Sequence, residues 1–332
     1  MRICVLPGDG IGPEVTAVAV DVLKALPASF SFEHGEIGYG AYEKAGAPLP
    51  KETVEKVEAA DATLMGAVTT PPNIPGYRSP VVELRRRFDL FVNLRPIKSM
   101  PHPTSREGVN FLLVRENTEG LYAGRERVEG DTAITERVIT RRGSERILRY
   151  AFERARDGGF RTVTVVHKAN VLRETCGLFR SVALDVAGDY PQVAMKEMLV
   201  DACAMNLISD PSSFEVIVTT NLFGDILGDE AAMLVGGLGL ACSANIGAEV
   251  AVFEPVHGSA PDIAGRGTAN PLASILSARL MLEHLGLAAE AKKVENAVAR
   301  TLKDTEVTPD LGGSLTTREV GDAVIRHMRN EP

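Results

Sequence analysis

Two carboxylates, Asp225 and Asp229, stand four residues apart directly after the apolar run 216–218. If Asp225 opens a helix, both side chains project from one face, with Cβ atoms roughly 5–6 Å apart, where like charges repel. A cation between them would remove that repulsion. Oxygen ligands without cysteine or histidine suit a hard divalent ion such as Mg²⁺ or Mn²⁺. In the alternative interpretation, Asp225 is a helix N-cap and Asp229 a solvated helix residue.

Three more clusters of polar residues follow short apolar runs, at 115–122, 167–170 and 254–262. Open α/β sheets bind ligands at the carboxyl ends of their strands. The clusters are therefore candidates for one shared site.

The elements that must position these residues are read from hydrophobic periodicity. Short apolar runs alternate along the chain with segments of helical spacing, and this alternation predicts an α/β fold with a largely parallel sheet. We expect strands at 2–6, 62–65, 110–114, 162–166, 215–218 and 250–253, and helices from Pro13 and at 51–59, 144–156, 172–187, 271–285 and 288–302.

The glycine-rich turn at 8–13 invites a dinucleotide-binding interpretation. However, Pro13 stands where the GxGxxG fingerprint requires its third glycine, so the fingerprint fails. A ligand near Ile11 and a purely structural turn both remain open. The segments 71–76 and 99–103 are rich in proline, which indicates a loop at the mouth of a cleft and a crossing between domains.

Size and composition narrow the class of protein. With 332 residues, 45% of them hydrophobic, the chain exceeds the usual size of a single core, which predicts two domains. A net charge of −8 argues against nucleic acid as a partner. No apolar segment is long enough for a membrane span or a signal peptide, so we expect a cytoplasmic protein. The four cysteines lack CxxC spacing and are expected to be buried thiols, without disulfide or zinc.

These motifs, taken in order from the turn at 8–12 to the segment 308–313, resemble the β-decarboxylating dehydrogenases that act on isocitrate, 3-isopropylmalate and homoisocitrate. The resemblance implies an isopropylmalate-dehydrogenase-like α/β fold with two domains and a central cleft, different from the Rossmann fold. Residues 1–98 and 238–332 would form the cofactor-binding domain, and residues 99–237 the domain for dimerisation and metal binding. It also implies a homodimer with shared active sites, possibly assembled further into a tetramer.

The same resemblance implies an oxidation by NAD, loss of CO₂ and reprotonation of an enolate. Mg²⁺ or Mn²⁺ would be held by Asp225, Asp229 and the Asp201 of the other subunit, and would act as a Lewis acid. Lys168 matches the base that takes the hydroxyl proton. Without the resemblance, a lysine at this position would be interpreted as part of a surface salt bridge. Tyr122 matches the acid that protonates the enol carbon. The alternative is a structural role as a core aromatic whose hydroxyl is hydrogen-bonded. Asn170 matches a residue near the substrate and the nicotinamide.

Three arginines, Arg85, Arg95 and Arg115, match the family's substrate-binding set. Arginine binds carboxylates with two parallel hydrogen bonds and keeps its charge. All three lie beside apolar runs, whereas Arg86 and Arg87 are expected on a solvated face.

NAD is expected rather than NADP. Relatives that use NADP carry Lys and Tyr where this chain has Asp262 and Ile263, and an aspartate can bond the ribose hydroxyls while repelling a 2′-phosphate. The predicted cofactor-binding residues are Ile11, Glu254, His257, Gly258, Ser259, Ala260, Asp262, Ile263 and Asn270.

Substrate choice in the family depends on the helix that carries Arg85. Isocitrate-type members carry Asn where Val81 stands, and homoisocitrate members carry Arg where Val82 stands. A branched alkyl group would be buried favourably against Val82, whereas a third carboxylate would lose hydration there. We therefore expect 3-isopropylmalate and a role in leucine biosynthesis. Arg78 or Ser79 could instead meet a carboxylate, so homoisocitrate (lysine biosynthesis), isocitrate or a broad range remain alternatives.

Two hypotheses of a different class are a non-catalytic regulatory subunit and a metal-dependent hydrolase. Retention of Tyr122, Lys168 and the three acids argues against the first. The adenosine motif from Asp262 to Asn270 argues against the second.

Overall fold

A single sheet runs through the computed structural model, which describes residues 1–74 and 76–330. In spatial order its ten strands within these residues are β2 (Ser31–His34), β1 (Arg2–Leu6), β3 (Ala62–Met65), β12 (Ala251–Pro255), β11 (Cys242–Ile246), β4 (Val92–Lys98), β5 (Asn110–Glu116), β10 (Val216–Thr219), β8 (Thr162–His167) and β9 (Ala194–Leu199).

The outer parts of the sheet are parallel and its middle is antiparallel. β4 runs antiparallel to both β11 and β5, and β11 is also antiparallel to β12. The remaining strand pairs are parallel, which confirms the prediction of a largely parallel α/β sheet. In this register Asn93 of β4 lies opposite Asn245 on one side and Arg115 on the other. The middle of the sheet is therefore polar.

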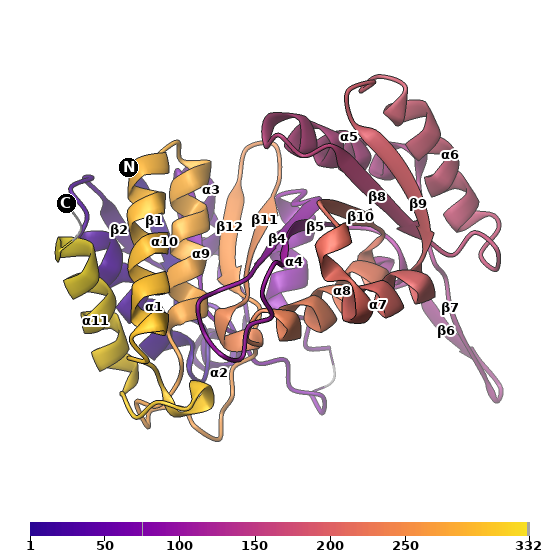
Figure 1. Ribbon diagram of the computed structural model, residues 1–332. Helices are drawn as coiled ribbons and strands as arrows, with labels where there is room; N and C mark the ends of the chain where they lie inside the picture. The colour runs from indigo at the N-terminus through magenta and orange to yellow at the C-terminus, as the bar shows by residue number, and fades with distance from the viewer. Residues whose placement is uncertain (75, 331–332) are drawn as a thin grey trace.

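Helices from both ends of the chain pack together on one half of the sheet (Figure 1). α1 (Gly12–Lys24) contacts α9 (Leu272–His284) and α11 (Thr317–Asn330), and α10 (Ala288–Lys303) contacts α9 and α11. Both termini lie at this end of the molecule. Three shorter helices complete this half: α2 (Tyr39–Ala45), α3 (Lys51–Ala59) and α4 (Pro80–Arg87).

The other half is built from the middle of the chain. α5 (Arg141–Asp157) packs against α6 (Thr175–Ala187), and α7 (Val200–Ser209) packs against α8 (Asn221–Leu234). The hairpin of β6 (Glu126–Glu129) and β7 (Thr132–Thr135) projects away from the body (Figure 1). Short 3₁₀ turns lie at η1 (Leu121–Ala123), η2 (Pro211–Ser213), η3 (Leu238–Leu240) and η4 (Pro309–Leu311).

Apolar positions repeated at helical and strand spacing form the core on the faces of the sheet. All four cysteines are buried, as predicted, and are free thiols. Within the described residues, none of the helices combines the length and apolar character that a membrane crossing requires. The predicted loop at 71–76 lies between β3 and α4, and its residue 75 falls outside the described residues.

The helix with the acid pair begins earlier than the sequence suggested. α8 starts at Asn221, with Thr220 at its N-cap position, so Asp225 lies in the second turn. Asp225 therefore neither opens the helix nor caps it. The spacing argument survives this correction, because both acids remain within one helix, four residues apart.

Candidate active site

Two buried arginines from neighbouring strands meet the acid pair of α8. Arg115 of β5 donates to a carboxylate oxygen of Asp225. Arg95 of β4 donates to Asp229 Oδ1 at 2.8 Å and to Asp225 Oδ1 at 3.4 Å. The side chains of Arg95 and Arg115 are only 7% and 2% exposed, so these contacts lie in a poorly screened environment. The structure thus unites four of the predicted site residues.

Glycines in α8 make room for the arginines. A Cβ atom on Gly224 would lie 2.6 Å from Arg115 Cγ, and one on Gly228 would lie 2.5 Å from Arg95 Nη1. Real Cβ contacts do not approach this closely. Asn221 Oδ1 accepts two more hydrogen bonds from Arg115, at 3.1 and 2.7 Å. The first two turns of α8 are therefore shaped around the guanidinium groups.

Tyr122 joins the same cluster from the turn η1. Its hydroxyl donates to Asp225 Oδ2 at 2.6 Å, and the Arg115 guanidinium lies 5.3 Å from its ring centre. Burial, followed by the hydrogen bond to Asp225, raises the pKa of Tyr122. Burial alone would raise the pKa of Asp225, but Arg115, Tyr122 and Arg95 outweigh it and hold that pKa below its usual value. Asp225 is therefore an anion, and Tyr122 is a protonated donor.

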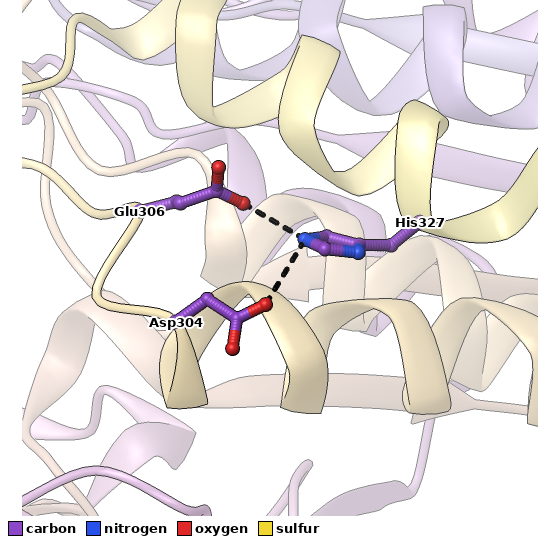
Figure 2. Close-up of side chains that lie close together, drawn as sticks. All are labelled: Asp304, Glu306 and His327. Carbon is purple, nitrogen blue, oxygen red and sulfur yellow. Dashed lines mark hydrogen bonds and ion pairs between the residues drawn. The ribbon is translucent and has the colours of Figure 1, made fainter. Parts of the chain in front are cut away.

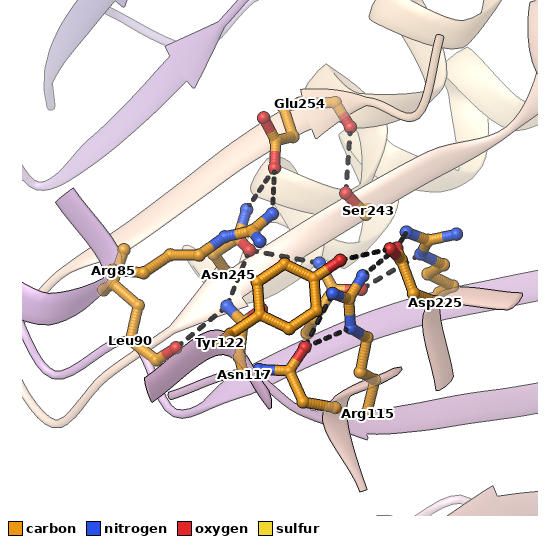
Figure 3. A network of polar contacts seen from close by, with 12 residues as sticks. Arg85, Leu90, Arg115, Asn117, Tyr122, Asp225, Ser243, Asn245 and Glu254 are labelled. Atoms are coloured by element: carbon orange, nitrogen blue, oxygen red, sulfur yellow. Dashed lines mark hydrogen bonds and ion pairs between the residues drawn. The ribbon is translucent and has the colours of Figure 1, made fainter. Parts of the chain in front are cut away.

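Buried amides link this cluster to Arg85 and Glu254 (Figure 3). Arg85 Nη2 lies 3.2 Å from Glu254 Oε1, which also accepts from Asn245 Nδ2 at 2.7 Å. Asn245 Oδ1 in turn accepts from Asn117 at 2.9 Å and Asn93 at 3.1 Å. Sequence reasoning missed Asn93 and Asn245, because single asparagines inside strands carry no recognisable pattern.

Lys168 and Asp201 form a separate ion pair at the ends of β8 and β9. Lys168 Nζ donates to Asp201 Oδ1, and this bond lowers the pKa of Asp201. The side chain of Asp201 is 62% exposed. Asn170 and Val171 lie in the turn after Lys168, and Val171 is 65% exposed.

Among the described residues, the group of three side chains placed to share one ion is Asp304, Glu306 and His327, rather than the predicted acids (Figure 2). His327 Nε2 lies 2.8 Å from Glu306 Oε2 and 3.9 Å from Asp304 Oδ2. Arg300 and Arg326 pair with the two carboxylates and offset their charge. We interpret this group as an ion-pair cluster that joins α10 to α11.

Several predicted cofactor residues come together around the glycine-rich turn. Ile11 N–H donates to Ser259 O at 2.9 Å, and a Cβ atom on Gly10 would overlap that same carbonyl. Ile11 packs in a small apolar cluster with Ala260, Ile263 and Ala269. Farther along the loop, Asn270 Nδ2 donates to Asp310 Oδ2 at 3.0 Å, and Asp262 is exposed.

His257 presents an unused nitrogen in this loop. Its Nδ1 lies 3.0 Å from Gly258 O, whereas its Nε2 is buried and has no partner among the described residues. Burial lowers the pKa of His257, so the ring is neutral at neutral pH. When Nδ1–H donates to the carbonyl, Nε2 is an acceptor for a donor group on a bound molecule.

A cavity of about 720 Å³ lies along one face of α4. Most of the residues around it are charged, and the others are small or apolar. They are Arg78, Ser79, Val82, Glu83, Arg86, Arg87 and Gly124.

Known proteins of one class share this fold and these motifs. The family described as isocitrate/isopropylmalate dehydrogenase matches residues 2–324. Over 99–100% of both chains, identity is 48% to a homoisocitrate dehydrogenase of Methanocaldococcus jannaschii and 50% to a 3-isopropylmalate dehydrogenase of Methanothermobacter thermautotrophicus. The solved structure of an isocitrate dehydrogenase from Methylococcus capsulatus superposes with a TM-score of 0.96, at 45% identity over 99% of each chain.

The chain belongs to the isocitrate/isopropylmalate dehydrogenase family. It is therefore a β-decarboxylating dehydrogenase with the α/β fold of that family, as the motifs predicted. The relatives' names are divided among isocitrate, homoisocitrate, 3-isopropylmalate and 3-methylmalate. An isocitrate/homoisocitrate dehydrogenase of Thermus thermophilus is 51% identical over 99% of both chains. Similarity alone therefore leaves the substrate open.

Proposed function

We propose that this protein oxidises and decarboxylates a 3-substituted malate, with NAD as acceptor and Mg²⁺ or Mn²⁺ as the metal, and that 3-isopropylmalate is its preferred substrate. The observation that carries the proposal is the joint placement of Arg95, Arg115, Tyr122 and Asp225 around one point. Cations that bind carboxylates and a proton donor are the groups this reaction requires.

Asp225 and Asp229 fit a hard divalent ion, because both offer only carboxylate oxygens and Asp229 is 59% exposed. When bound, the ion supplies Lewis-acid stabilisation of negative charge on the substrate oxygen. In the absence of a cation, Arg95 and Arg115 balance the two acids. Substrate carboxylates would draw the arginines away and leave the aspartates for the ion.

Lys168 and Asp201 act as one unit in this proposal. They are ion-paired with each other and, within the described part of the chain, form no hydrogen bond or ion pair with the Asp225 cluster. If Asp201 completes the metal site of the other subunit, Lys168 must enter that site with it. Lys168 can take the hydroxyl proton only as a free amine, so Asp201 must first be neutralised by another partner.

An exposed apolar face supports the homodimer. Met205 and Ile208 of α7 and Ile226 and Met233 of α8 are each 59–71% exposed. Neither helix carries a lysine or arginine. Exposed apolar side chains on two helices that pack together indicate a protein interface, and Asp201 lies at the start of α7. A second copy of the chain bound here would share the active sites.

The remaining residues bind and protonate the substrate. Burial lowers the pKa of Arg115 to about 10, which still leaves it charged at neutral pH. With Arg85 and Arg95 it can hold two carboxylates in bidentate geometry. The Tyr122 hydroxyl, polarised by its neighbours, delivers the proton to the enol carbon.

NAD fits the loop around the turn at 8–12. The free Nε2 of His257 and the exposed carboxylate of Asp262 offer acceptors for amino and hydroxyl groups of an adenosine. When bound, NAD supplies the hydride acceptor. The division into domains of residues 1–98 with 238–332 and of residues 99–237 is part of the proposal, and the packing of α1 against α9 and α11 supports it.

Val82 in the wall of the α4 cavity favours a branched alkyl substituent. A second candidate substrate, homoisocitrate, is favoured by Arg78 and Ser79 in the same wall. Both substrates carry the malate carboxylates that the arginines bind.

The test is NAD reduction assayed in parallel with 3-isopropylmalate, homoisocitrate and isocitrate, with Mg²⁺ or Mn²⁺ present, and with NADP as the alternative acceptor. We expect the highest kcat/KM with 3-isopropylmalate and NAD, and loss of activity on chelation that added metal restores. A large advantage for a tricarboxylate would overturn the argument from Val82. Full turnover after exhaustive chelation would overturn the metal site.

A further inference from the structure

The turn that carries Tyr122 is held mainly by contacts with other segments, among them the Tyr122 hydroxyl on Asp225 and the backbone bridge between Gly120 and Val138. η1 is three residues long and lies between Gly120 and Gly124, whose φ angles are +75° and +67°. No side chain caps it. A short turn between two left-handed glycines has little intrinsic rigidity, so its position depends on contacts with neighbouring elements.

Arg86 of α4 provides such a contact. Its Nη2 donates to the backbone carbonyls of Tyr122 at 2.8 Å and Ala123 at 3.2 Å. A Cβ atom on Gly124 would lie 3.3 Å from the same nitrogen, so a larger residue there would crowd the guanidinium. A hydrogen bond from a charged donor is stronger than one between neutral groups. Although Arg86 is exposed, as the sequence suggested, it is engaged with the turn rather than free in solvent.

The helix that makes this contact also carries substrate-facing residues. Arg85 pairs with Glu254, and Val82 lines the cavity beside α4. Arg86 thus connects the element that contacts the substrate to the turn that holds the proton donor. In the proposed division, it also spans the two domains.

We propose that Arg86 is a positioning residue, which fixes Tyr122 through its backbone and couples the placement of α4 to the protonation step. The inference rests on the proposed function, in which Tyr122 donates the proton. Arg86 lines the same cavity as Val82, but its guanidinium group donates to the backbone of the turn. Its loss should therefore affect turnover through Tyr122 and leave substrate binding by the three arginines largely intact.

A double-mutant cycle tests this coupling. We expect Arg86→Met to lower kcat about 10-fold while KM changes less than about 3-fold, and Arg86→Lys, which keeps a donor, to recover most of the loss. Tyr122→Phe should lower kcat at least about 100-fold. In the Tyr122→Phe background, Arg86→Met should change kcat less than about twofold, because the group it positions is gone.

Arg142→Met is the matched control, since Arg142 is 85% exposed and lies in α5. It should leave kcat unchanged, and thermal unfolding should show that all variants fold. Equal losses from Arg86→Met in both backgrounds, or no loss in either, would overturn the positioning role. Full activity of Tyr122→Phe alone would instead overturn the proposed role of Tyr122, so the two failures are distinguishable.

Discussion

At the scale of single residues, Asp225 is the centre of the site. It accepts hydrogen bonds from Arg115, Arg95 and Tyr122, which come from two strands and a turn. Each donor favours the ionised carboxylate, and together they overcome the effect of burial on its pKa. The same charge that would bind a cation thus also orients the proposed proton donor.

His167, next to Lys168, permits a prediction about pH. It is 5% exposed, and Nδ1 accepts the Ala169 N–H at 3.2 Å. Burial lowers its pKa, with Arg180 adding to the effect and Glu197 opposing it. As the pH falls, the His167 side chain therefore binds a proton at about pH 6.5 in the unfolded chain, and only at a lower pH in the folded protein. The contribution of His167 to stability is complete above that pH and is lost as the pH falls toward the folded-state pKa.

We expect His167→Asn to flatten the dependence of unfolding free energy on pH below about pH 6.5, measured by urea denaturation. The asparagine keeps an acceptor for Ala169 but does not titrate. If the pH dependence of the unfolding free energy were the same in the His167 variant, the conclusion that the buried ring is neutral in the folded protein would be wrong.

At the scale of elements, α8 positions the site through its glycines as much as through its acids. Gly224 and Gly228 lie on the face that meets Arg115 and Arg95. Glycine weakens a helix interior by about 1 kcal/mol relative to alanine. Here that cost is offset by the close approach of the two guanidinium groups to the helix.

Gly228→Ala is therefore expected to displace Arg95 from Asp229, to destabilise the fold by about 1–3 kcal/mol and to raise the substrate KM about 10-fold or more. Thermal unfolding and steady-state kinetics measure the two effects. Gly177→Ala in α6 is the control, since an added Cβ there meets no atom within 4 Å. That change should be neutral or stabilising. Equal behaviour of the two variants would refute the packing argument.

At the scale of the whole molecule, the proposed active site is distributed over more than one chain. Arg85, Arg95, Arg115 and Tyr122 gather at one place, whereas Lys168 and Asp201 are paired with each other elsewhere. The apolar face of α7 and α8 offers a means to combine these two sets in a symmetric dimer.

Met205→Asp should convert the proposed dimer to a monomer, because it places a charge among the exposed apolar side chains of α7 and α8. Sedimentation velocity should show half the mass, and activity should fall at least about 100-fold because Lys168 is missing from each site. The control is Leu184→Asp, which changes an exposed apolar residue of α6. It should alter neither the sedimenting mass nor the activity. An active monomer would rule out shared sites.

Much of the architecture was predictable from periodicity. The predicted helix at 51–59 coincides with α3. The one at 271–285 is longer than α9 by one residue at each end, and the one at 288–302 ends one residue before α10 does. β4 and β11 were not predicted as strands. They carry buried polar residues such as Asn93, Arg95 and Asn245, which interrupt the apolar runs by which strands are recognised.

The sequence by itself determined which chemical groups exist and on which kind of element each lies, because spacing along the chain sets local structure. Only the tertiary structure decided their partners. Asp225 meets Arg95 and Arg115 because the antiparallel register of β4 and β5 brings both beneath α8. Lys168 meets Asp201 because β8 and β9 are parallel neighbours that end together. Such pairings depend on strand order, and strand order is set by packing across the whole chain.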